Sequence, residues 1–160
     1  MGRQIPEGAR ESLLGIGKWL DVNGEAIYGT SSWTKSGEGP TSVKMGEEGD
    51  AMFNESDLVY TAKDIRFTVK GNVLYAIVLD WPEEDVLIKS LVQAGEDSED
   101  EEEYDGYYIY PDEIKSITML GDGKELKWEL VKGKGLKITP PKEKPCEHAF
   151  TFKIVRGSDK

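Results

Sequence analysis

The chain has 160 residues, a net charge of −11 and an apolar content of 38%. That length allows one domain with its own hydrophobic core, and that apolar content argues against disorder throughout. The charge excludes the basic face that nucleic acid or an anionic membrane surface would require, and no apolar run reaches the ~20 residues of a membrane span.

The negative charge is concentrated in one segment. Residues 96–105 carry eight acidic side chains and no basic one, so the rest of the chain has a net charge of only −3. Ca²⁺ binds clustered carboxylates, but the spacing fits no EF-hand loop and the run lacks the glycine of a sharp turn. We therefore expect a solvated acidic loop at residues 94–106 rather than a calcium site.

The first predicted element is a helix over residues 6–22. Pro6 suits the first helical position, which needs no N–H, and Asn23-Gly24 predicts the end of the helix because either residue tolerates a left-handed conformation. Apolar residues recur at helical spacing and form a face that requires a cover. That face consists of Leu13, Ile16, Trp19 and Leu20.

A segment rich in Gly, Ser and Thr follows the helix, over residues 24–42. Clusters of these residues are typical of loops, so the segment is predicted to be a linker or a long surface loop. Residues 43–62 show only a weak apolar pattern and carry no assignment.

From Asp64 onward the apolar pattern has a period of two. Residues 65–70 alternate as a half-buried strand does, Gly71-Asn72 predicts a hairpin turn, and residues 73–79 form the apolar run of a central strand. Further strands are predicted over residues 86–91, 107–110, 114–120, 126–131, 136–139 and 149–155. These short strands favour a mainly β fold: an antiparallel, Greek-key-like β-sandwich preceded by one N-terminal α-helix.

Several aromatic residues have both a functional and a structural interpretation. Trp33 and Trp81 could form a platform on which a sugar ring stacks, but a tryptophan beside a strand end is more often a core or rim residue. Trp128 allows the same two interpretations. A tyrosine cluster beside the acidic loop could be a carbohydrate-binding edge or one face of a strand; it consists of Tyr104, Tyr107, Tyr108 and Tyr110.

The chain contains one cysteine, Cys146, and one histidine, His148. A single cysteine allows no intrachain disulfide, so the cysteine content does not indicate whether the protein works in an oxidising or a reducing compartment. Two potential ligands two residues apart, with no second pair, do not match the spacing of structural zinc sites, so we predict no metal and no cofactor. His148 is a poor general base, since no nucleophile can be assigned beside it.

A series of motifs extends along nearly the whole chain, starting with the stretch over residues 18–34. The motifs that follow it are Leu74–Ile77, Asp80–Glu83, Ile117–Gly121, Leu126–Trp128, Gly135–Ile138, Pro140-Pro141 and Phe150–Ile154. In this order they resemble the C-terminal part of α-L-fucosidases of glycoside hydrolase family 29, and residues 18–34 are similar to the segment that closes the catalytic barrel of that family.

The resemblance implies a division of the chain into three parts. Residues 1–23 would be the last helix of a (β/α)₈ catalytic barrel, residues 24–42 a linker, and residues 43–157 the C-terminal β-sandwich. A complete barrel needs about 250 residues and therefore cannot fit here. The acidic run is a departure, because relatives have a shorter connection there.

The family hydrolyses terminal α-L-fucose from glycans with retention, using one carboxylate as nucleophile and another as acid/base. The family's aspartate nucleophile and fucose-binding histidines belong to earlier barrel strands, and no position here matches them. We therefore predict no catalytic residue in this chain and no fucosidase activity for it alone. Family members are often secreted, periplasmic or lysosomal.

Three functions follow from these observations. The first is a non-catalytic scaffold whose partner is the catalytic barrel of the full-length enzyme. The second is a carbohydrate-binding module that contacts fucosylated glycan through Trp33, Trp81 or the tyrosine cluster. The third is a stand-alone domain for protein contacts. In the absence of the barrel, the face of Leu13, Ile16, Trp19 and Leu20 would dock on the sandwich or mediate self-association.

Overall fold

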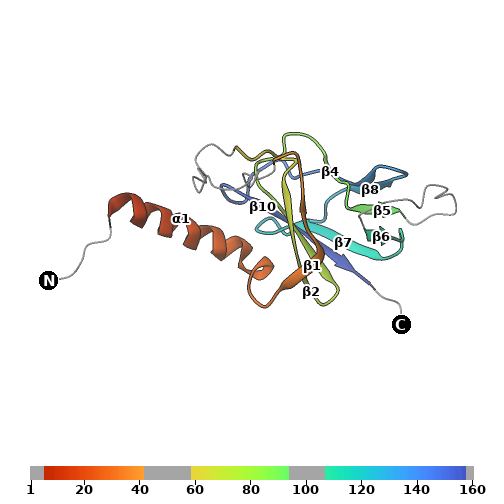
Figure 1. Ribbon diagram of the computed structural model, residues 1–160, viewed down its shortest axis with the longest axis horizontal. Helices are drawn as coiled ribbons and strands as arrows, with labels where there is room; N and C mark the ends of the chain where they lie inside the picture. Colours follow the sequence, from red (N-terminus) through yellow and green to blue (C-terminus); the bar gives the residue numbers. More distant parts are fainter. Residues whose placement is uncertain (1–5, 42–58, 94–106, 158–160) are drawn as a thin grey trace, which may run out of the picture.

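The computed structural model describes residues 6–41, 59–93 and 107–157. The predicted acidic loop at residues 94–106, with Tyr104, lies outside the described residues. The chain forms one long helix followed by a β-sandwich (Figure 1). The elements are α1 (Glu7–Asn23), the 3₁₀ turn η1 (Gly24–Ala26), β1 (Ser31–Glu38), β2 (Ile65–Lys70), β3 (Val73–Val78), β4 (Val86–Ile88), β5 (Leu91–Gln93), β6 (Tyr107–Ile109), β7 (Ile114–Met119), β8 (Trp128–Val131), β9 (Gly135–Ile138) and β10 (Phe150–Arg156).

The strands form a five-stranded antiparallel sheet, in the order β1-β2-β3-β10-β7, and a three-stranded antiparallel sheet, in the order β4-β9-β8. The predicted antiparallel β-sandwich with one N-terminal helix is therefore confirmed. One small departure is the pair β5-β6, whose strands run parallel. The predicted strand over residues 86–91 divides into β4 and β5, because the backbone N–H groups of Lys89 and Ser90 bond to the carboxylate of Glu38 instead of a ladder.

The main core lies between the sheets. Phe67, Leu74 and Phe152 point inward from the five-stranded sheet and pack with Ile88 and Leu136 from the facing strands, all of them buried. Burial of this apolar area is the main favourable term in folding the sandwich.

The central strand β3 is buried on both faces. Leu74, Ala76 and Val78 face the main core, while Tyr75 and Ile77 lie in a second cluster on the outer face. That second cluster includes Ala26 of η1 and is packed by Trp19 and Val22 of α1, among others. The cover on its outer face explains why residues 73–79 are almost continuously apolar.

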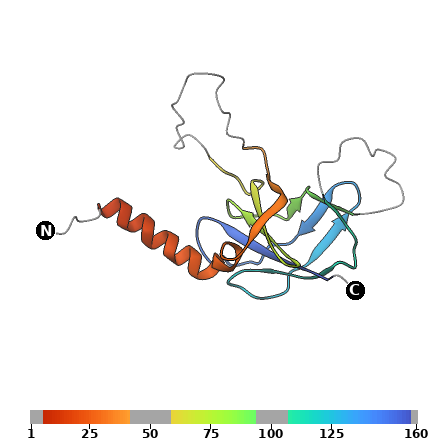
Figure 2. The ribbon, with the colours of Figure 1, turned by 60° about the horizontal axis from the view of Figure 1, so that its bottom comes forward.

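Within the described residues, the helix packs on the sandwich through its C-terminal end, at Trp19 and Val22. Figures 1 and 2 both show α1 extending away from the sheets toward the N-terminus. Leu13 and Ile16 are 56% and 55% exposed, whereas Trp19 and Leu20 are half-buried. The predicted docking of this face on the sandwich is therefore achieved only over the last turns of the helix.

The end of the helix differs from the prediction. Gly24 has a right-handed conformation, with φ −57°, and the chain continues as η1. The left-handed glycine that turns the chain is Gly29, with φ +69°. The predicted linker at residues 24–42 is also wrong in part, since β1 lies inside it and pairs with β2. Long-range pairing and the burial of Trp33 here outweigh a loop-like composition.

Candidate functional site

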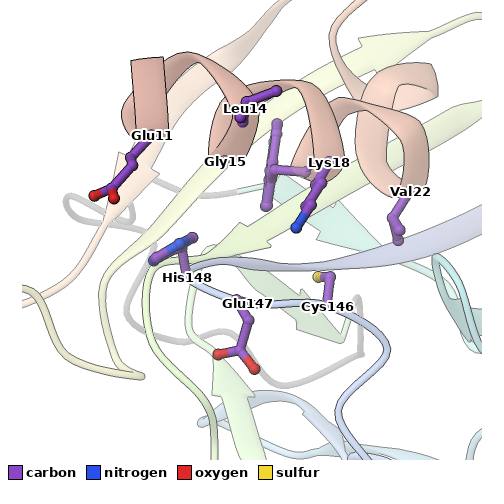
Figure 3. Close-up of a pocket in the computed structure, with 9 residues that line it drawn as sticks. Glu11, Leu14, Gly15, Lys18, Val22, Cys146, Glu147 and His148 are labelled. Atoms are coloured by element: carbon purple, nitrogen blue, oxygen red, sulfur yellow. The ribbon is translucent and has the colours of Figure 1, made fainter. Parts of the chain in front are cut away.

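A groove of about 500 Å³ lies between α1 and the loop that precedes β10 (Figure 3). Residues from one side of the helix form one wall, and the loop residues Cys146, Glu147 and His148 form the other. The helix contributes Glu11, Leu14, Gly15, Lys18, Trp19 and Val22. They fall on one side because an α-helix turns by about 100° per residue.

The loop wall has a strained backbone. The N–H of Ala149 donates a 3.0 Å hydrogen bond to the carbonyl of Glu147, which closes a γ-turn centred on His148. His148 has a φ of +77° and is the one non-glycine residue with positive φ in the described ranges. γ-Turns of this hand are rare and strained. The turn places the imidazole of His148 on the helix side of the loop, opposite Glu11 and Lys18 (Figure 3).

A set of hydrogen bonds fixes the floor of the groove. The Nε1–H of Trp19 donates to the carbonyl of Ala149 at 2.9 Å, and the thiol of Cys146 donates to the same oxygen at 3.2 Å. The side-chain amide of Asn23 donates to Trp19 O at 3.1 Å and to Cys146 Sγ at 3.4 Å. The indole of Trp19 is thus held in one orientation, 130 residues away in sequence from its partner.

The thiol of Cys146 is unsuited to nucleophilic chemistry. Burial raises the pKa of Cys146, the charge of Glu147 raises it further, and the hydrogen bond from Asn23 opposes both effects. A thiol with a raised pKa stays protonated, and the thiolate is the nucleophile. The carboxylate of Glu147 points away from the helix, which leaves Glu11 as the carboxylate that extends toward the loop (Figure 3). This arrangement suits binding rather than covalent catalysis.

A second polar cluster anchors the other side of the helix end. Glu25 of η1 accepts a 2.9 Å hydrogen bond from the Tyr75 phenol and forms a 3.0 Å ion pair with Lys153. Burial would raise the pKa of Glu25, but the hydrogen bonds from Lys153 and Tyr75, with the charges of Lys153 and Lys70, outweigh it and lower that pKa. Burial and the Glu25 carboxylate together raise the pKa of Tyr75 to about 12.

The predicted sugar-contact residues Trp33 and Trp81 do not come together. Trp33 is 8% exposed and packs edge-on against Phe67, with ring centroids 5.0 Å apart. Trp81 is half-buried, lies edge-on to Phe150 at 4.9 Å and has the Lys144 ammonium 5.9 Å from its ring centroid. The burial of Trp33 supports its structural interpretation, and a sugar contact through Trp81 stays a prediction.

The tyrosine cluster is divided in a similar way. Tyr107 packs against the main core with its ring centroid 5.8 Å from that of Trp33. Tyr108 and Tyr110 are exposed. Trp128 is half-buried and packs on the core.

Sequence reasoning missed the groove. It singled out Cys146 and His148 but considered them only as metal ligands or as an acid–base group. Among residues 6–41, 59–93 and 107–157, no group of three or more His, Cys, Asp and Glu side chains could hold a metal ion. No helix within these ranges is long and apolar enough to cross a membrane. The sequence signal that indicates this groove is the spacing of Glu11, Lys18 and Val22, which places the three residues on one side of the helix.

The sequence of the chain is similar to that of a group of known proteins. Residues 57–155 match the family model described as the alpha-L-fucosidase C-terminal domain. The chain is 32% identical over 151 residues to human tissue alpha-L-fucosidase, with 91% of this chain and 24% of that protein covered. It is 29% identical over 157 residues to the alpha-L-fucosidase of Branchiostoma floridae, with 96% and 26% covered.

The crystal structure of the Thermotoga maritima alpha-fucosidase has a similar fold, with a TM-score of 0.60 and 26% identity. The match covers 95% of this chain and 28% of that one. It therefore extends beyond residues 57–155 to most of the helix and β1. The chain spans about a quarter of the length of these relatives.

Proposed function

Because the chain belongs to the α-L-fucosidase C-terminal domain family, we propose that it serves as the non-catalytic β-sandwich of an α-L-fucosidase and supports a catalytic domain. The observation that carries this proposal is the extent of the match. The relatives align with this chain over at least nine-tenths of its length, yet it corresponds to only a quarter of theirs. The parts of those enzymes outside the match have room for a (β/α)₈ barrel of about 250 residues.

The exposed apolar side of α1 supports a partner of this kind. Leu13 and Ile16 are more than half exposed on the side of the helix away from the groove. An apolar stripe of this kind on a helix is normally covered by packing against another part of the protein. Covering a Leu or Ile side chain fully is worth about 1.5–3 kcal/mol, so these residues favour contact with the catalytic domain.

This proposal divides the chain functionally. Residues 7–23 would belong with the catalytic domain as its last helix, and β1 to β10 would form the supporting sandwich. The hydrolysis of terminal α-L-fucose would then be carried out by two carboxylates outside this chain. The hydrogen bond of Glu25 with Tyr75 and its ion pair with Lys153 would hold the helix at a defined angle to the sandwich.

An activity assay tests the absence of catalysis. The purified 160-residue chain is incubated with 4-nitrophenyl α-L-fucoside, and the Thermotoga maritima enzyme serves as the positive control. We expect no release of nitrophenol above the rate in buffer. Turnover that co-purifies with the chain through a second, orthogonal column would refute a non-catalytic role.

Self-association of the isolated chain tests the uncovered helix face. In the absence of a catalytic domain, we expect two or more copies to cover the apolar side of α1 by associating through it. Multi-angle light scattering should then give a mass above 17.8 kDa for the wild type and 17.8 kDa for the Leu13→Glu/Ile16→Glu variant. Tyr110→Glu changes an exposed apolar residue elsewhere and should leave the assembly intact. A monomeric wild type would argue that the face needs no partner.

A further inference from the structure

We propose that the groove between α1 and residues 146–148 is a binding site for a neutral oligosaccharide. This goes beyond the supporting role above and does not depend on it. The groove volume of about 500 Å³ falls in the range of ~300–1,000 Å³ that is usual for small-ligand sites. Its lining has the composition of such sites, with an apolar floor and a few polar groups at the rim.

The floor offers a fixed aromatic surface. Trp19 lines the groove, and the hydrogen bond from its Nε1 to Ala149 O at 2.9 Å holds the indole in place. The face of an aromatic ring carries negative potential, and the C–H groups on one face of a sugar ring carry partial positive charge. Leu14 and Val22 extend the apolar surface on either side along the helix. A sugar ring can therefore stack on the floor with little loss of side-chain entropy on binding.

The rim selects a ligand without net charge. Glu11 and Lys18 extend from the helix toward the loop, and His148 faces them from the other wall (Figure 3). An anionic ligand would meet Glu11 and a cationic one would meet Lys18. The third charged group of the lining, the carboxylate of Glu147, points away from the helix, so one charge of each sign faces the space between the walls (Figure 3). Sugar hydroxyls both donate and accept hydrogen bonds, and this rim offers an acceptor in Glu11, a donor in Lys18 and two ring nitrogens in the imidazole of His148.

The strained turn at His148 fits a binding role. A non-glycine residue at a φ of +77° costs free energy, and such strain persists where the surrounding structure holds it. Here the hydrogen bonds of Ala149 with Trp19, Cys146 and Glu147 hold the turn. The result is a loop backbone that is held in one conformation before any ligand arrives, which reduces the entropy lost on binding.

The groove stays accessible in the proposed full-length arrangement. At about 100° per residue, Glu11, Lys18 and Val22 lie on the side of α1 opposite to Leu13, Ile16 and Leu20. A catalytic domain that covers the second set leaves the first set facing the loop.

Saturation-transfer NMR on the whole 160-residue chain tests the proposal, with 2′-fucosyllactose as the probe. We expect saturation transfer to the sugar protons, and chemical-shift changes at Trp19 Nε1–H rather than at Trp81. Glu11→Gln, Lys18→Gln and His148→Gly should each lower the association constant at least fivefold. His148→Gly removes the imidazole at a position where glycine is unstrained, so loss of folding would not explain that result.

Two control variants match these changes in charge. Asp21→Asn alters an exposed carboxylate on the same helix outside the groove, and Lys124→Gln alters an exposed lysine on another loop. Both should keep wild-type affinity. Absence of saturation transfer with the wild type overturns the proposal, as does binding that survives all three groove variants or shifts that centre on Trp81. None of these outcomes bears on the supporting role, which the activity and light-scattering experiments test separately.

Discussion

The phenol of Tyr75, at the centre of the five-stranded sheet, donates a 2.9 Å hydrogen bond to the carboxylate of Glu25 in the turn after α1. Lys153, beside Tyr75 on β10, shares that carboxylate at 3.0 Å. The two contacts connect the helix end to the middle of the sheet. These polar contacts lie beside the apolar cluster formed by Ala26, Tyr75 and Ile77, and both connect the turn after α1 to the sheet.

Replacement of Tyr75 by Phe should weaken this connection while preserving the packing of the ring. A hydrogen bond to a charged group contributes about 1.5–3 kcal/mol, and the solvent exposure of Glu25 reduces that figure, so we expect a loss of about 1 kcal/mol in the free energy of unfolding. Urea denaturation followed by circular dichroism measures it. Tyr28→Phe, at a ring that is 63% exposed, should change stability by less than about 0.5 kcal/mol. Equal effects of the two variants would contradict the assignment.

The same contact predicts a loss of stability in alkali. The pKa of Tyr75 is raised to about 12 from its ordinary value of 10.0, first by burial and then by Glu25. The unfolded chain therefore releases this proton at a lower pH than the folded chain does. The stabilisation is complete below pH 10 and is lost as the pH rises from about 10 to about 12. Spectrophotometric titration at 295 nm should show one late-ionising tyrosine in the wild type and an earlier one in Glu25→Gln.

The buried carboxylate of Asp64 predicts an acid-sensitive contribution. It accepts hydrogen bonds from the N–H and hydroxyl groups of both Thr41 and Thr61, at 2.7–3.1 Å. Burial would raise the pKa of Asp64, but these four bonds outweigh it and lower the pKa below its ordinary value. The stabilisation is present at neutral pH and is lost as the pH falls below about 4, through the folded-state pKa.

Asp64→Asn should therefore cost about 2 kcal/mol at pH 7, since its amide NH₂ would face hydrogen-bond donors. The difference between wild type and variant should shrink steadily as the pH falls from 4 to 2. Urea denaturation at pH 7, 4 and 2.5 measures both effects. The exposed Asp80 accepts a hydrogen bond from the backbone N–H of its neighbour Trp81 at 2.8 Å, and Asp80→Asn serves as the charge-matched control. A gap that stays constant with pH would rule out titration of Asp64 as its cause.

Much of the fold could be predicted from local patterns. The helix at residues 7–23 and the hairpin of β2 and β3 have strong periodicities and a clear turn at Gly71, whose φ is +59°. β1 could not be predicted, because it is stabilised by pairing with β2 and by the burial of Trp33 rather than by its own composition. The division between β4 and β5 depends on the carboxylate of Glu38, which is more than 50 residues away.

The candidate site could be predicted only in part, for a similar reason. The helix side of the groove follows a simple repeat, but nothing in the sequence pairs Trp19 with Ala149. The apolar face predicted from Leu13, Ile16, Trp19 and Leu20 is not one surface in the structure. Trp19 lies toward the sandwich, while Leu13 and Ile16 lie in solvent. The positive φ of His148 is set by tertiary hydrogen bonds and has no local sequence signal.

That strained turn leads to a prediction of increased stability. A non-glycine residue in the left-handed region costs about 1–2 kcal/mol, and glycine adopts positive φ without this penalty. His148→Gly should therefore raise the free energy of unfolding by about 0.5–1 kcal/mol, after the larger backbone entropy that glycine loses on folding. His148→Val should lower it, because a β-branched residue is least tolerant of positive φ. Differential scanning calorimetry of the two variants gives opposite shifts in Tm if the turn is strained as described. A decrease in Tm for both would instead mean that the imidazole itself stabilises the loop.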